Sequence, residues 1–252
     1  MIVLVVVGLI FPLFTFILNM YHDAYYLDEK VKMSTEASQA LWYMEDNVRI
    51  AGSFLTSVPS AYTDPYGPHN LGTAGAEAWS YKGDSAASRV LITKNYSTTA
   101  NPLNSGRQPV FKNTAAFNCT TQMLYQPQLT YVAIYFVKDK TLYYRLVTDK
   151  VSALCPGNVQ QQKHSCPPYI TSGRHASCQA NDEILATNVS NFTVAYYQII
   201  QDGVNVQLDA TYTSSDPDIL VTADYAEVTL TESTRDGAVT TTLKQRMTKV
   251  NQ

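Results

Sequence analysis

The chain has 252 residues, of which 15% are charged, and its net charge is -3 at pH 7. A small negative net charge gives no sign of a basic surface that would attract nucleic acid, so we expect no nucleic-acid partner. The length suits one moderate domain or two small ones, and the 18 tyrosines suit β-strands on a wet surface.

The run from Met1 to Tyr21 is apolar and contains no charged residue. About twenty residues at a helical rise of about 1.5 Å reach roughly 30 Å, the thickness of a bilayer's hydrocarbon core. No Lys or Arg precedes the run and its end is bulky, which distinguishes it from a cleaved signal peptide. We therefore predict a retained transmembrane helix over residues 1–21, with a local bend at Pro12 because proline removes one backbone hydrogen bond.

Residues 22–52 continue the same helix with an amphipathic pattern. Apolar side chains recur at gaps of three or four residues, the spacing of one helical face, and charged residues fill the gaps. We predict that Leu41, Met44 and Val48 dock this face on a sheet, and that Gly52 stops the helix. The two halves together predict one helix of about fifty residues, about 75 Å long.

Residues 53–252 are predicted to form an extracytoplasmic, β-rich globular domain. A connection rich in Gly and Pro covers 53–87. The later runs typical of strands are 88–94, 129–138, 141–147, the latter half of 184–200, 224–233 and 239–250. Asp139–Lys140 and Asp236–Gly237 supply turns for two hairpins. One long helix followed by an antiparallel sheet is an α+β domain.

The loop region 151–180 carries three of the four cysteines, and the full set is Cys119, Cys155, Cys166 and Cys178. An even number of cysteines outside the cytosol predicts disulfide bonds. Four cysteines allow three connectivities, and the sequence leaves them open. Short loops favour Cys155–Cys166 together with Cys119–Cys178.

Nothing in the sequence predicts catalysis. The nucleophile elbow, the zinc-protease helix and the phosphate-binding loop are all missing, so we expect no enzyme activity and no cofactor. A zinc site is the alternative to disulfides, because His164 and His175 lie among the cysteines and both residue types bind zinc. The H-x-C and H-x-x-C spacings differ from the usual zinc-binding pairs, which favours disulfides over a metal.

Three segments carry a family resemblance: MIVLVVVG (1–8), ALWYMEDNVRIAGSF (40–54) and AEVTLTESTRDGAVTTTLKQRMTKVNQ (226–252). The chain resembles the type IV pilin-like family, and more narrowly W-type minor pilins and J-type pseudopilins of type II secretion. The first segment is similar to the apolar stretch after the prepilin cleavage site. The second is similar to the end of the long helix, and the third to the closing hairpin.

The resemblance implies a structural subunit, a minor pilin or pseudopilin, of a type IV pilus or a type II secretion-like filament. Such a subunit is a single-pass protein of the cytoplasmic membrane with its C-terminal domain outside. The inner-membrane assembly platform then moves it from lipid into an extracellular filament, where its partners are other pilin subunits. We expect Val5, Val6, Gly8 and Pro12 to serve helix packing and bending in the filament core.

Two alternatives remain open from the sequence. One is a major pilin, and the other is a membrane-anchored or pilus-tip adhesin that binds a surface or a partner cell. The family's processing glycine and early glutamate would fall upstream of Met1. This difference predicts that the sequence begins inside the helix.

Overall fold

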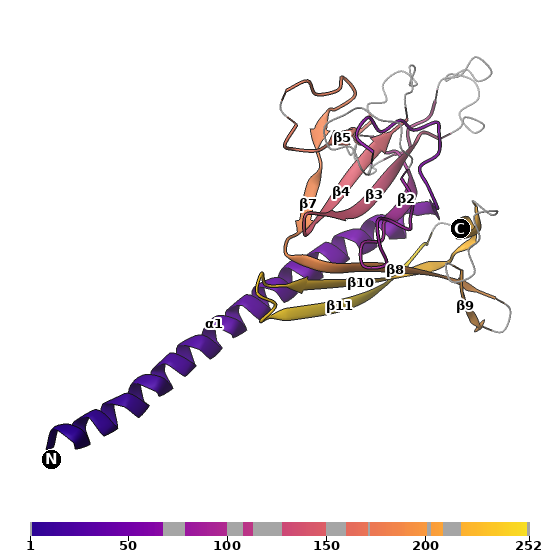
Figure 1. Cartoon of the computed structure of the whole chain (residues 1–252). Coiled ribbons are helices and arrows are strands. Elements are labelled where there is room, and N and C mark those ends of the chain that lie inside the picture. The colour runs from indigo at the N-terminus through magenta and orange to yellow at the C-terminus, as the bar shows by residue number, and fades with distance from the viewer. Residues whose placement is uncertain are drawn as a thin grey trace.

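The computed structural model describes residues 2–67, 79–99, 108–112, 128–149, 160–170, 172–200, 203–208 and 218–250, and the side chains of the long helix from residue 14 onward. Within these ranges one long N-terminal helix packs against antiparallel sheets, which confirms the predicted α+β class (Figure 1). The C-terminal half of the helix lies beside the sheets, and its N-terminal half projects away from them (Figure 1).

Helix α1 (Ile2–Arg49) is a single helix of 48 residues, close to the predicted length. It continues through Pro12 without a break in the assigned helix. Arg49 in its last turn places a cation at the negative end of the helix dipole and bonds Asp46 at 2.6 Å. The backbone N–H of Val250 donates to the carbonyl of Arg49 at 3.1 Å, so the C-terminal segment returns to the end of the helix.

The prediction that Gly52 stops the helix was wrong. The helix ends at Arg49, and Gly52 lies inside the short strand β1 (Ala51–Phe54). A Cβ atom at this position would lie 3.3 Å from the ring of Tyr96, which is tighter than ordinary van der Waals contact. The glycine therefore permits close approach to an aromatic ring of the neighbouring strand and does not supply a left-handed turn.

A five-stranded antiparallel sheet has the order β1-β2-β3-β4-β7. Its remaining strands are β2 (Leu91–Tyr96), β3 (Thr130–Lys138), β4 (Thr141–Thr148) and β7 (Glu183–Ala186). The predicted β3–β4 hairpin is confirmed, and both turn residues, Asp139 and Lys140, have positive φ (48° and 60°). Two such residues form the tight turn whose twist matches that of the flanking strands.

A four-stranded antiparallel sheet has the order β11-β10-β8-β9. Its strands are β8 (Val189–Ile199), β9 (Asn205–Gln207), β10 (Tyr225–Ser233) and β11 (Thr240–Thr248). The predicted β10–β11 hairpin is confirmed, with Gly237 at a φ of 73° in its turn. The smaller elements are the parallel pair β5 (Ser165–Cys166) and β6 (Ala180–Asn181), and the 3-10 helix η3 (Ile219–Thr222).

The main hydrophobic core lies where α1 meets the inner faces of both sheets. It includes Leu41 and Met44 from α1, Tyr135 from β3, Tyr196 from β8 and Val228 from β10. A second cluster lies on the other face of the five-stranded sheet, and its members include Trp79, Ile92, Val132, Ile134 and Phe136. Because β3 has apolar neighbours on both faces, its side chains are buried along most of the strand, unlike a half-exposed strand with alternating burial.

Replacing Met44 with Ala is expected to lower the free energy of unfolding by about 2–5 kcal/mol, because it leaves a cavity in the main core. Urea denaturation followed by circular dichroism measures the change. Trp42→Ala is the matched control, since Trp42 lies on the same helix and is 71% exposed. We expect the control to change stability by no more than about 0.5 kcal/mol. Equal losses in the two variants would contradict the docking.

Candidate functional site: the exposed surface of the long helix

The docked half of α1 is defined by one buried stripe of side chains. Its members are Met33, Ala37, Leu41, Met44 and Val48, each 3% exposed or less. They recur at gaps of three or four residues, so they share one helical face. This face contacts β11, β10 and β7. The structure thus places the three predicted docking residues in the main core. The buried stripe extends toward the N-terminus as far as Met33.

Side-chain hydrogen bonds fix the docked half at its edges. They join Glu36 with Thr187, Tyr43 with Glu183, and Glu45 with Gln245. The Glu36 carboxylate accepts from the backbone N–H of Thr187 at 2.5 Å and from its hydroxyl at 3.0 Å. The Tyr43 hydroxyl donates to Glu183 at 2.9 Å. Burial and the adjacent Glu183 carboxylate raise the pKa of Tyr43, so this hydroxyl remains a donor at physiological pH.

The projecting part of α1 presents large apolar side chains to solvent. We call the following residues the exposed helix surface: Phe14, Phe16, Ile17, Leu18, Met20, Tyr21, Tyr25, Leu27 and Val31, which are 41% to 74% exposed. Singly exposed apolar residues are ordinary, but a large contiguous patch marks a surface that contacts another molecule or a membrane. The exposed helix surface is therefore the candidate functional site, and its chemistry is apolar and aromatic contact.

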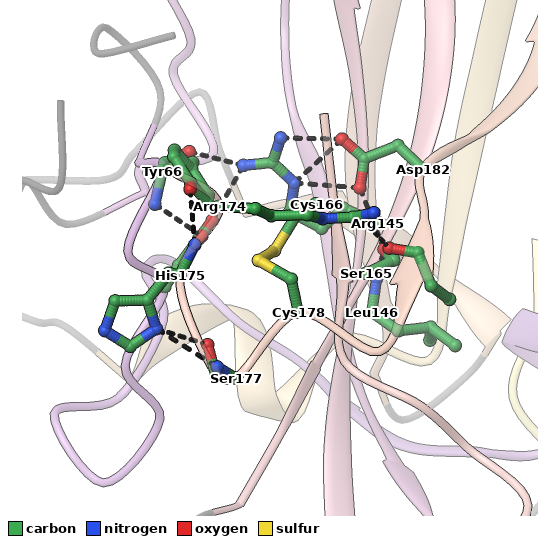
Figure 2. The surroundings of a disulfide bond; sticks show 12 residues. Tyr66, Arg145, Leu146, Ser165, Cys166, Arg174, His175, Ser177, Cys178 and Asp182 are labelled. Carbon is green, nitrogen blue, oxygen red and sulfur yellow. Dashed lines mark hydrogen bonds and ion pairs between the residues drawn. A yellow bond between two sulfur atoms is a disulfide. The ribbon is translucent and has the colours of Figure 1, made fainter. Parts of the chain in front are cut away.

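A buried ionic cluster on the far side of the five-stranded sheet holds the loops of the globular domain. Arg145, in the middle of β4, is almost fully buried and pairs with Asp182 at 2.6 Å and Asp64 at 2.9 Å. Its guanidinium also donates to the carbonyl of Tyr66 (Figure 2 shows Arg145, Asp182 and Tyr66). Burial by itself would lower the pKa of Arg145, but the carboxylates of Asp182 and Asp64 raise it on balance. The guanidinium is thus charged and paired.

The two acids of this cluster are themselves fully bonded. Asp64 accepts from the indole N–H of Trp79 at 2.7 Å and from the backbone N–H of Tyr66 at 2.9 Å. Asp182 accepts from the hydroxyl of Ser165 at 2.8 Å (Figure 2). Since buried charges are stable only when paired and hydrogen-bonded, the cluster is built as a structural clamp. We assign it no catalytic step.

The structure overturns the expected disulfide pairing. Cys166 bonds Cys178, with Cα atoms 5.7 Å apart, so both Cys155–Cys166 and Cys119–Cys178 were wrong (Figure 2). The pairing of β5 with β6 explains this result, because the register Cys166↔Asn181 brings the chain just before β6 beside β5. Cys119 and Cys155 lie outside the described residues. The disulfide also uses the sulfurs of Cys166 and Cys178, two of the cysteines considered for the alternative zinc site.

The predicted filament residues Val5, Val6, Gly8 and Pro12 lie among the first thirteen residues, whose side chains are outside the described part of the chain. Among the residues that the structure describes, no helix combines the length and apolarity needed to cross a membrane. Comparison with protein-family models and with curated proteins finds no match for this chain. The long N-terminal helix packed on antiparallel sheets has a shape consistent with pilin-like folds.

Sequence reasoning missed the Arg145 cluster. The one available signal was a charged residue in the middle of the apolar strand TLYYRLV, where an arginine needs buried partners. The partners, Asp64 and Asp182, are 81 and 37 residues away, and nothing in their local sequence distinguishes them from surface acids.

Replacing Asp182 with Ala is expected to lower the free energy of unfolding by about 3–5 kcal/mol, because it leaves a buried guanidinium with only one carboxylate. Urea denaturation measures the loss. Glu227→Ala is the control, since Glu227 forms its ion pair with the exposed Lys244. That surface pair is expected to contribute no more than about 1 kcal/mol. A similar loss in both variants would contradict a buried clamp.

The disulfide assignment is tested by alkylation of the denatured, unreduced protein and peptide mass spectrometry. In the wild type we expect Cys178 to resist alkylation, and in Cys166→Ala we expect it to become fully alkylated, because its partner is gone. Cys155→Ala is the control, and it should leave Cys178 protected. Alkylation of Cys178 in the Cys155→Ala variant would show that another pairing is present.

Proposed function

We propose that the chain is a structural subunit, a minor pilin or pseudopilin, of a type IV pilus or type II secretion-like filament. The observation that carries the proposal is the exposed helix surface, an apolar surface on a helix that projects beyond its own domain (Figure 1). The resemblance of the first eight residues and of the helix end supports the same function, as does the pilin-like shape.

The projecting half of α1 suits burial against lipid or against other helices. Burying one large apolar side chain contributes on the order of 1.5–3 kcal/mol. Burial of the whole exposed helix surface against another molecule would therefore be strongly favourable in free energy. Lipid tails and a bundle of apolar helices can both supply that burial. In this mechanism the cytoplasmic membrane holds single subunits with their β-rich domains outside, and the assembly platform transfers them to the filament. The transfer exchanges lipid contacts for helix–helix contacts and needs no catalytic group.

The docked half of α1 supplies the second requirement, a rigid connection. A filament subunit must hold its globular domain in a fixed orientation on the helix, or neighbouring domains would collide. The buried stripe and the bonds of Glu36 and Tyr43 give α1 this fixed seat on the sheets. The apolar surface at one end of the helix and the anchored domain at the other together favour a filament subunit over a plain membrane anchor.

Val6→Asp tests the proposal, because a charge in a dry helix bundle lacks solvation and should exclude the subunit from filaments. We expect this variant to be lost from sheared filaments when it is produced in its native host. The Cys166–Cys178 disulfide, assayed by peptide mapping, should still form, since it lies in the distant globular domain. Val6→Leu is the matched control and should be incorporated normally. Normal incorporation of Val6→Asp would overturn the proposed assembly role.

A further inference from the structure

Glu232 is a buried carboxyl group that no described contact explains. It lies near the end of β10, on the inner face that also carries Val228 and Leu230, and its side chain is fully buried. Within the part of the chain that the structure describes, neither carboxyl oxygen has a hydrogen-bond partner. An ionised carboxylate without a partner is among the most costly groups to bury, so the packed hairpin favours the neutral acid.

No positively charged group among the described residues acts on Glu232. Its cross-strand partners are Thr241 on β11 and Val189 on β8, and neither ionises. On α1, the charged group that acts on Glu232 is the carboxylate of Glu36, which also accepts a hydrogen bond from Thr187 in the β7–β8 turn. The ion pair of Glu227 with Lys244 lies on the opposite face of the hairpin, because successive side chains of a strand alternate between faces. Burial first, and the Glu36 carboxylate second, raise the pKa of Glu232 to about 8.

We propose that Glu232 is a proton-dependent latch, which holds the β10–β11 hairpin on α1 while its carboxyl is neutral and loosens the hairpin when it ionises. The latch acts at the edge of the docked half, where the hairpin meets the helix near Glu36. Ionisation places a fully buried carboxylate near the half-exposed carboxylate of Glu36, and separation of the hairpin from the helix lets water reach Glu232. The proposal depends on how the hairpin packs against α1, and it is independent of the proposed filament role.

The direction of the pH effect follows from linkage. Glu232 has a pKa of about 8 when packed, and its ordinary value of 4.5 when the hairpin is open. The packed state therefore binds the proton more tightly, and its advantage is complete below about pH 4.5. The advantage falls between about pH 4.5 and pH 8, by up to about tenfold per pH unit in the opening equilibrium, and it is fully lost once the pH has risen through 8. Above that pH the latch is released.

Hydrogen–deuterium exchange of the full chain in a non-ionic detergent tests the latch between pH 5 and pH 9. After correction for intrinsic exchange rates, we expect the opening of β10 and β11 to rise steeply with pH in the wild type. The amides of β3, in the other sheet, serve as the internal reference and should not follow this rise. These measurements are made with a chelator that removes divalent cations. A second series with millimolar calcium in place of the chelator tests whether a bound cation protects the hairpin.

Three variants separate the latch from general destabilisation. Glu232→Gln mimics the neutral acid and should abolish the pH dependence of hairpin opening while the hairpin remains docked at pH 9. Glu36→Gln should keep the pH dependence but move it to lower pH, because one of the two causes of the raised pKa is removed. Glu227→Gln, on the exposed face of the same strand, should behave as the wild type.

Hairpin opening that is independent of pH in the wild type would overturn the latch. The same conclusion follows if Glu232→Gln retains the wild-type pH dependence. Protection of the wild-type hairpin by calcium, lost in Glu232→Gln, would also overturn it, since a bound cation and not a proton would then neutralise the carboxylate.

Discussion

Helix α1 packs against the sheets through one face, and this packing determines which of its other side chains are exposed. The stripe from Met33 to Val48 is buried against β10, β11 and β7. The helix therefore covers one face of the four-stranded sheet, and this contact fixes the orientation of the helix. The turn of the β10–β11 hairpin, residues 238–240, lies beside residues 22–30 of the helix. Among the described residues, the side chains of the exposed helix surface remain 41% to 74% exposed, and from this exposure we infer assembly.

The globular domain has a second constraint, on the opposite side of the five-stranded sheet. There the Arg145 cluster and the Cys166–Cys178 disulfide hold together loops that are far apart in the sequence. The two devices differ in kind, because the disulfide restricts the unfolded chain, whereas the ion pairs exist only once both carboxylates are buried with the guanidinium. The carboxyl of Glu232, buried where the hairpin meets the helix, has no such partner among the described residues, and on this we base its proposed dependence on a proton.

The secondary structure was largely predictable because its signals are local. Residues 21–51 showed three- and four-residue gaps without Gly or Pro, and the two hairpins showed β-rich runs around Asp139–Lys140 and Asp236–Gly237. The errors came where a distant partner decides the conformation. Gly52 reads as a helix stop in isolation, yet the ring of Tyr96 on β2 explains its presence in a strand. The cysteine pairing depended on the β5–β6 register, which no spacing rule contains.

The sequence by itself determined an α+β chain with one long N-terminal helix, an apolar N-terminal segment and a C-terminal hairpin, because each follows from a short-range period or composition. Only the tertiary structure decided where the helix seat ends, which cysteines pair, and that Arg145, Asp64 and Asp182 form one cluster. Those features arise from contacts between residues far apart in the chain. Local residue patterns do not encode such distances, because they are set only when both sheets and the helix pack together.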